Sequence, residues 1–165
     1  MVMDCTASIP LSIQLDNGQC ALGFSLDVQR IIDSVSHDEA GATAVFIGTT
    51  RNSFKGKVVT RLEYQAYSTL AIKTMANIVR DVQAAMTAGD SAAARPIIRC
   101  AVHHRLGVVP VGEPSIVIAV SAPHRKEAFV ACERILEDIK AKAQIWKREY
   151  YENESDETAE WKANQ

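Results

Sequence analysis

The sequence predicts an α+β domain with a mainly antiparallel sheet and interleaved helices. Short runs of β-branched and apolar residues lie close together along the chain and are separated by turn residues, which is typical of antiparallel neighbours. Two longer segments, 69–86 and 121–149, repeat apolar residues every three or four positions, as amphipathic helices do. Because these helices separate groups of strands, a layered α+β architecture is expected.

The length of 165 residues is enough for one domain with a proper core. We expect that domain to occupy residues 1–150, followed by an acidic C-terminal tail over 151–165. The formal net charge of -2 gives no global basic field, which argues against a nucleic-acid-binding protein. Four scattered cysteines without zinc spacing, and the lack of a long apolar run or signal segment, predict a soluble cytoplasmic protein.

The first elements are a hairpin or edge strand, a short helix and a strand. Residues 12–15 alternate in polarity, and 16–18 read Asp-Asn-Gly, a turn signal. Residues 28–35 carry apolar positions at helical spacing after Ser25 or Asp27 as N-cap. Residues 42–50 are apolar enough to predict a strand buried on both faces.

The loop over residues 51–57 contains three cations and a glycine. It is either a solvated hairpin turn or a binding loop, because loops at strand ends often carry binding residues. Residues 58–67 then alternate, with Leu62, Tyr64 and Ala66 on one face. The opposite face is expected to be exposed to solvent or covered by a partner.

The second half of the chain continues with a helix over 69–86 and a surface loop over 84–95. Strands are predicted over 96–103 and 115–121, with a turn at Gly112-Glu113-Pro114 between them. His103 and His104 lie at a strand end without further ligands at metal spacing, so we interpret them as structural residues. No metal site is predicted.

The segment 121–149 contains most of the residues on which the prediction of function depends. We expect one long helix whose core-facing stripe follows helical spacing: Phe129, Cys132, Leu136, Ile139 and Ala143. With Pro123 in its first turn, the helix places His124, Arg125 and Lys126 where the helix dipole is already positive. A bound phosphate or carboxylate would relieve this conflict.

At the other end of the same predicted helix, Lys140 and Lys147 lie two turns apart. They would project along one line, with Trp146 as an apolar wall beside them, if the helix persists that far. The alternative is that all these cations are solvated surface residues, as most lysines and arginines are.

Several motifs occur in a fixed order. They are GATAVFIGTTRNSFKGKVV, LEYQAY, HHRLGVVPVGEPSIVIAVSAPHRKEA and LEDIKAKAQIWKREYYE. Nucleotide-binding and acyl-hydrolase signatures are absent from the sequence. Over residues 41–162 the chain resembles the family of large, catalytic subunits of molybdopterin synthase.

The resemblance implies an α/β hammerhead fold and a homodimer of large subunits within a heterotetramer. Each large subunit would bind a small ubiquitin-like subunit whose C-terminal Gly-Gly carries a thiocarboxylate. The implied reaction adds two sulfurs to cyclic pyranopterin monophosphate and forms the dithiolene of molybdopterin. It needs no cofactor or metal in this subunit, because molybdenum enters later.

The resemblance also assigns residues. Thr49, Thr50 and Arg51 would bind the pterin substrate, and His124 and Arg125 would reach the same site from the partner protomer. Lys140 and Lys147 would be catalytic, and Arg148 and Glu149 would share their pocket. The alternative function is a non-catalytic module of the same fold that binds an anion or a ubiquitin-like tail.

Overall fold

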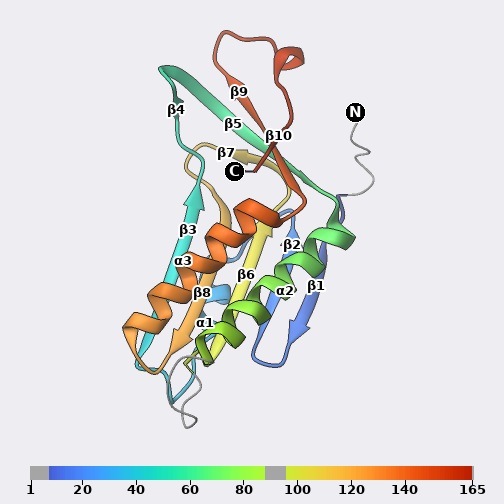
Figure 1. The fold of residues 1–165 in the computed structure, drawn as a ribbon. Coiled ribbons are helices and arrows are strands. Elements are labelled where there is room, and N and C mark those ends of the chain that lie inside the picture. Colours follow the sequence, from blue (N-terminus) through green and yellow to red (C-terminus); the bar gives the residue numbers. More distant parts are fainter. Residues whose placement is uncertain (1–7, 88–95, 165) are drawn as a thin grey trace.

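Two five-stranded sheets form the framework of the molecule (Figure 1). The computed structural model describes residues 8–87 and 96–164. The first sheet has the order β1-β2-β6-β8-β3, and of its pairs only β2 with β6 is parallel. Its strands are β1 (Leu11–Leu15), β2 (Gly18–Gly23), β6 (Arg99–Arg105), β8 (Pro114–Ala122) and β3 (Ala42–Thr49).

The second sheet is fully antiparallel in its described pairs and lies at one end of the first. Its order is β10-β9-β5-β4, and β7 also pairs with β5. Its strands are β10 (Lys162–Ala163), β9 (Ile145–Tyr151), β5 (Lys57–Ala66), β4 (Ser53–Phe54) and β7 (Gly107–Pro110). The predicted α+β class with mainly antiparallel strands is therefore confirmed.

Helices cover both faces of the first sheet. The long helices α2 (Ser68–Thr87) and α3 (Arg125–Lys142) run side by side over one face and share the main core with it. The short helix α1 (Val28–Asp33) packs on the other face through a second cluster that contains Ile31 and Val117. Alternation along β6 and β8 supplies apolar residues to both clusters.

The predicted N-terminal hairpin and short helix are confirmed, although the helix ends at Asp33 and does not include Val35. The alternating segment forms the edge strand β1, and the Asp-Asn-Gly turn joins it to β2 as a hairpin. Asp27 is the N-cap of α1 and accepts a hydrogen bond from the Arg30 backbone nitrogen at 3.1 Å. The helix predicted over 69–86 is α2.

The prediction of one long helix over 121–149 is wrong. Helix α3 ends at Lys142, Ala143 is extended, and residues 145–151 form strand β9 beside β5. The run Ile-Trp-Lys-Arg-Glu-Tyr-Tyr is rich in aromatic residues, which favour strands, and β5 offers its free edge to it. Lys147 therefore lies on a strand.

The start and the stripe of this helix also differ from the prediction. His124 is the N-cap with extended backbone angles, so the first turn begins at Arg125 and includes the acidic Glu127. Phe129 is 65% exposed and does not face the core. The buried stripe is shifted by one position at its start and consists of Ala128, Ala131, Cys132, Ile135 and Ile139.

Strand β3 is not buried on both faces, contrary to the prediction. It is the edge strand of the first sheet, next to β8 alone. Ala44 is buried in the main core under α2 and α3, whereas Val45 and Ile47 point to the opposite face, where α1 packs, and are 38% and 42% exposed. An apolar sequence thus marks an edge strand here.

The remaining strands shift at their ends. The strand predicted over 96–103 begins at Arg99 and continues through Arg105. On the outer face of β5, Arg61 pairs with Asp156 of the chain's own C-terminal segment at 2.7 Å, and Glu63 pairs with Arg148 of the neighbouring strand β9 at 3.0 Å.

The C-terminal segment folds back along β9 instead of leaving the domain. The predicted boundary after residue 150 falls inside β9, and a short 3-10 helix, η2 (Asp156–Thr158), leads back to β10. Residues 84–87 of the predicted surface loop are the last turn of α2, and 88–95 lie outside the described residues. In the described part of the chain, no helix is long and apolar enough to cross a membrane.

Candidate active site

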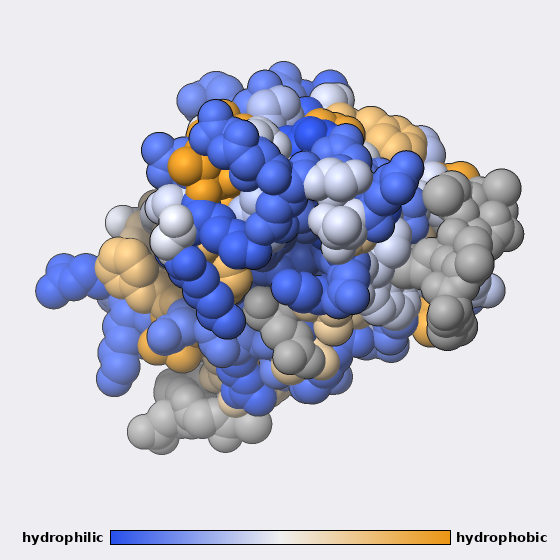
Figure 2. All heavy atoms as spheres, turned by 90° about the horizontal axis from the view of Figure 1, so that it is seen from above, coloured by the Kyte–Doolittle hydropathy of each residue, from blue (hydrophilic) through white to orange (hydrophobic). Residues whose placement is uncertain are grey.

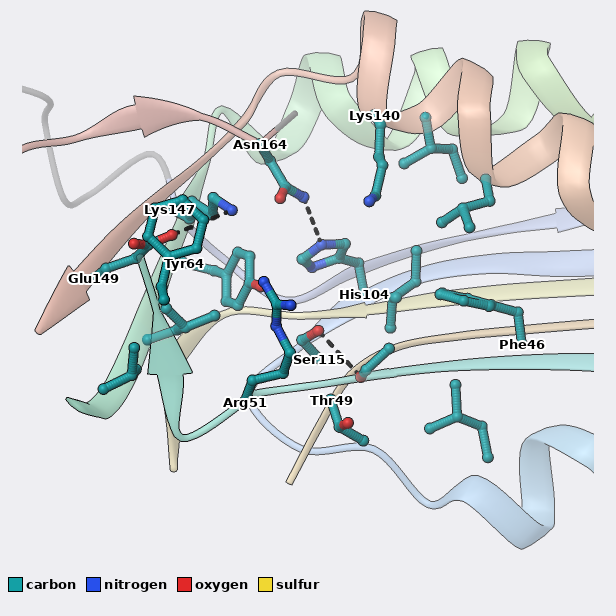
Figure 3. A pocket seen from close by; sticks show the side chains of 18 of the residues that line it. Phe46, Thr49, Arg51, Tyr64, His104, Ser115, Lys140, Lys147, Glu149 and Asn164 are labelled. Carbon is teal, nitrogen blue, oxygen red and sulfur yellow. Dashed lines mark hydrogen bonds and ion pairs between the residues drawn. The ribbon is translucent and has the colours of Figure 1, made fainter. Parts of the chain in front are cut away.

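A pocket of about 420 Å³ lies where the second sheet meets the end of the first sheet and the C-terminal end of α3 (Figure 3). Nineteen residues line it: Phe46, Ile47, Gly48, Thr49, Arg51, Ser53, Phe54, Val59, Leu62, Tyr64, His104, Ser115, Ile116, Leu136, Ile139, Lys140, Lys147, Glu149 and Asn164. The surface at this end of the molecule is mostly hydrophilic, with small hydrophobic patches between polar residues (Figure 2). A polar or charged ligand would therefore suit it.

Three cations reach the pocket from three separate elements (Figure 3). Arg51 follows the end of β3, Lys140 is in the last turn of α3, and Lys147 is on β9. Arg51 and Lys140 make no ion pair with any residue that the structure describes, and both are exposed. The site is thus able to bind an anion without first breaking an existing pair.

The carboxylate of Glu149 holds the third cation. Its Oε1 is 3.4 Å from Lys147 Nζ, and the side chain is only 10% exposed. Its other oxygen accepts a hydrogen bond from the Tyr151 hydroxyl. Burial acts to raise the pKa of Glu149, but the Tyr151 hydrogen bond and the Lys147 charge outweigh it, so the net pKa is lowered. Glu149 therefore stays ionised beside Lys147.

A buried histidine forms part of the pocket floor. His104 is 1% exposed, its Nδ1 is 2.8 Å from the carbonyl oxygen of Arg105, and its Nε2 is 3.2 Å from Nδ2 of Asn164. Burial lowers the pKa of His104 to about 4, so the imidazole is neutral near pH 7. Tyr64 packs edge-on against it, with ring centroids 5.0 Å apart.

The rest of the floor is shaped by the first sheet. Ser115 donates a hydrogen bond to the carbonyl oxygen of Gly48 at 3.2 Å, which ties β8 to β3 below the pocket. Burial raises the pKa of Tyr64, so its hydroxyl stays protonated. Apolar side chains of α3, including Leu136 and Ile139, close one wall.

Five predicted site residues line the pocket together: Thr49, Arg51, Lys140, Lys147 and Glu149. Lys140 and Lys147 both line the pocket, although they are not on one helix as predicted: Lys140 is on α3 and Lys147 is on β9. The pairing of β9 with β5 brings Lys147 opposite Tyr64.

Four other predicted site residues do not line the pocket of this chain. Thr50 is buried, and its hydroxyl donates to the carbonyl oxygen of Val109 at 3.3 Å. Arg148 points to the other face of β9, where it pairs with Glu63 and stacks 4.6 Å from the Trp161 ring. His124 and Arg125 lie at the opposite end of α3, about 22–24 Å from Lys140 along the helix.

Among the lining residues without a predicted role, His104 and Asn164 are joined by a hydrogen bond in the pocket floor. His104 was interpreted as a structural residue of a strand end, and Asn164 lay in a segment interpreted as an acidic tail. A local pattern does not reveal that residues 60 positions apart share a hydrogen bond. For Asn164, no sequence signal points to the pocket.

Known proteins are similar to this chain over most of its length. The family model described as "MoaE protein" matches residues 24–142. A protein of Pyricularia oryzae called "Molybdopterin synthase catalytic subunit" is 46% identical over 148 residues, which cover 88% of this chain and 75% of that protein. "Molybdopterin synthase catalytic subunit 2" of Aedes aegypti is 42% identical over 139 residues, 84% of each chain.

Solved structures resemble the fold. A molybdopterin synthase structure from Staphylococcus aureus superposes with a TM-score of 0.74 and 29% identity, over 86% of this chain and 94% of that one. A Helicobacter pylori structure of a complex of subunits 1 and 2 of molybdopterin-converting factor has a TM-score of 0.62, over 83% of this chain and 86% of that one. At 21% identity, the second likeness concerns the fold alone.

Proposed function

The chain belongs to the MoaE protein family, and from this premise we propose how its pocket carries out the synthesis of molybdopterin. The chain is a sulfur-transferring enzyme of molybdenum cofactor biosynthesis, as its relatives named molybdopterin synthase catalytic subunit are. In the proposed reaction, cyclic pyranopterin monophosphate receives two sulfurs from thiocarboxylates at the C-terminus of a small subunit. The proposal includes a cytosolic location and no resident metal or cofactor.

The convergence of Arg51, Lys140 and Lys147 on one pocket is the observation that carries this proposal. The pterin substrate bears a cyclic phosphate, and the sulfur donor ends in a thiocarboxylate, so both are anions. A site with three cations from three elements can bind the phosphate and the thiocarboxylate at the same time. Arg51 can donate two N–H groups to the phosphate.

The two lysines are proposed to have different roles. Lys140 is exposed at the pocket and free of ion pairs in the described chain, so it can act as nucleophile or as acid and base when the cyclic phosphate opens. Lys147, held by Glu149, orients the acyl end of the donor and stabilises the charge that develops there. In each transfer, the donor sulfur bonds to a pterin side-chain carbon while a carbon–oxygen bond of that carbon breaks. The oxygen leaves with the opened phosphate in one transfer and as water in the other. Water then cleaves the acyl–sulfur bond, which leaves a carboxylate on the small subunit and a thiolate on the pterin.

The proposed partner is a small ubiquitin-like subunit with a C-terminal Gly-Gly. The Helicobacter structure is a complex of two subunits, and we expect the same kind of assembly here, with two large subunits at its centre. His124 and Arg125 lie too far from Lys140 on their own helix to share its pocket. We propose that they complete the pocket of the partner protomer, where they bind the pterin phosphate.

The proposal is tested by single-turnover incubation with the pterin and a thiocarboxylated small subunit, followed by mass spectrometry of the pterin. We expect a gain of two sulfurs with opening of the cyclic phosphate, and a loss of roughly 100-fold or more in rate for Lys140→Ala and Lys147→Ala. Lys142→Ala is the matched control, because Lys142 is on the same helix but pairs with Asp138 at 3.1 Å.

Full turnover by Lys140→Ala would contradict its assigned role. If the pterin binds but returns unchanged with a competent donor, the alternative of a non-catalytic module that binds an anion or a ubiquitin-like tail is favoured instead.

A further inference from the structure

The side chain of Asn164 enters the pocket from the C-terminal segment and faces His104, which lies near the C-terminal end of β6 (Figure 3). Its backbone is fixed, because β10 pairs with β9 and the Asn164 nitrogen donates to the carbonyl oxygen of Ile145 at 3.1 Å. Lys162 lies opposite Lys147 in this pairing. The Asn164 amide is therefore held next to the strand that carries Lys147.

The orientation of the Asn164 amide follows from the tautomer of His104. A carbonyl oxygen can only accept, so the short contact of 2.8 Å with Arg105 requires a hydrogen on Nδ1 of His104. The neutral imidazole then has a bare lone pair on Nε2, which needs a donor. The Asn164 Nδ2 group, 3.2 Å away, supplies it.

With its nitrogen on His104, the amide turns its oxygen toward the open pocket. Figure 3 shows the Asn164 oxygen on the side of the amide that faces Lys147. A carbonyl oxygen that points into a pocket lined by lysines can accept a hydrogen bond from an ammonium group. The buried imidazole makes this orientation permanent, because the reversed amide would place its oxygen against the Nε2 lone pair.

We propose that Asn164 is a positioning residue for Lys147, and that His104 fixes the Asn164 amide for this task. The inference rests on the proposed function. The Lys147 ammonium has three N–H groups. The Glu149 carboxylate lies 3.4 Å from this ammonium and takes one direction. In the proposed arrangement, the Asn164 oxygen, which is on the Lys147 side of its amide in Figure 3, accepts a second N–H once the sulfur donor is bound, and the third N–H is directed at the acyl end of that donor.

The first test is the rate of sulfur transfer by Asn164→Ala. We expect kcat to fall roughly 10- to 100-fold, as for the loss of one hydrogen bond to a charged group, with the KM for the pterin unchanged. Asn77→Ala is the control: Asn77 is an exposed asparagine of α2 that accepts from Arg80, away from the pocket. It should transfer sulfur like the wild type.

A double-mutant cycle shows whether Asn164 acts through Lys147. If it does, Asn164→Ala lowers the rate of a Lys147→Ala enzyme by less than twofold, because the group that it positions is gone. Full additivity of the two losses, or a wild-type kcat for Asn164→Ala, would overturn the inference. If the wild-type enzyme transfers no sulfur to the pterin, the proposed function itself is refuted.

Nitrogen NMR of the imidazole tests the orientation without turnover. We expect His104 to be the Nδ1-protonated neutral tautomer near pH 7, with an Nε2 signal that shifts in Asn164→Ala and not in Asn77→Ala. A proton on Nε2 would require the Asn164 oxygen to face His104, and the inference would then be wrong.

Discussion

His104 lies in the floor of the pocket, in contact with Tyr64 and Asn164. It is fully buried, and burial holds its pKa at about 4, below the ordinary value of 6.5. A proton added to this ring would have to enter an apolar environment beside Tyr64 and would also disturb the Asn164 amide. The fold therefore favours the neutral imidazole, which the proposed orientation of the Asn164 amide also needs.

The low pKa of His104 predicts acid sensitivity of the fold. Above about pH 6.5 the residue is neutral in both states, but between pH 6.5 and 4 only the unfolded chain binds the proton, so stability is lost as the pH falls through this range. From about pH 7.5 to pH 5 we expect His104 to contribute a loss on the order of 2 kcal/mol.

Urea unfolding at the two pH values measures this loss. His104→Gln serves as the comparison, since it cannot titrate in this range and should lose clearly less stability than the wild type. Burial also lowers the pKa of His103. The stability that this residue costs at low pH is the same in the wild type and in His104→Gln, so it cancels in the comparison. Equal losses in the two proteins would show that His104 is not the responsible group.

At the scale of elements, the parallel pairing of β2 with β6 depends on a close backbone approach. Gly18 lies opposite Cys100, and a Cβ at position 18 would be 1.8 Å from the Cys100 carbonyl oxygen. The oxygen belongs to the backbone of β6, and the Cβ would be attached directly to the backbone of β2, so neither strand can yield without loss of pairing. A side chain at this position forces β2 away from β6.

We expect Gly18→Ala to lower the free energy of unfolding by about 3 kcal/mol, at the upper end of the usual cost of overpacking. Gly23→Ala, at the other end of the same strand, is the control, because its Cβ would be 3.6 Å from the Ser25 carbonyl oxygen, an ordinary contact. Urea unfolding of both variants measures the difference. Similar midpoints for the two would contradict the steric argument.

Local sequence predicted the elements well where side-chain period and turn residues decide the structure. The β1–β2 hairpin and the α1 cap follow from a turn triplet and from Asp27. The prediction failed at residues 145–151, where pairing with β5 determines a strand and no local rule reports that a strand edge is available. It failed at β3 because apolar content does not distinguish a central strand from an edge strand.

The residues of the candidate site could also be predicted only in part. The resemblance assigns Thr49, Arg51, Lys140, Lys147 and Glu149 to the site, the spacing had already singled out the two lysines, and all five line one pocket. The contribution of Asn164 could not be predicted, because it depends on the C-terminal segment folding back onto β9. That segment is held by long-range contacts, among them the stacking of Arg148 on Trp161.

At the scale of the whole molecule, one chain does not hold all the proposed substrate-binding residues in one place. Arg125 begins α3 and Lys140 is near its end, about 22 Å apart along the helix axis. A rigid helix in the core cannot bring its two ends together. If Arg125 binds the pterin phosphate, it must do so in the pocket of a second protomer.

Mixed dimers test this arrangement. In a dimer of one Arg125→Ala chain and one Lys140→Ala chain, the first chain keeps its own Lys140 and receives Arg125 from its partner, so one of the two pockets is intact. Two inactive variants, unfolded together and refolded, should regain about a quarter of the wild-type sulfur transfer, since half of the dimers are mixed and each has one working pocket of two.

The matched control mixes Lys140→Ala with Lys147→Ala. Both lysines line the same pocket of one chain, so no mixed dimer has an intact pocket and no activity should return. Recovery in the first mixture and none in the second would establish that α3 serves two sites, Lys140 in its own pocket and Arg125 in the neighbouring one. Without recovery in either mixture, Arg125 would act within its own chain or not at all, because exchange between partners could not repair the site.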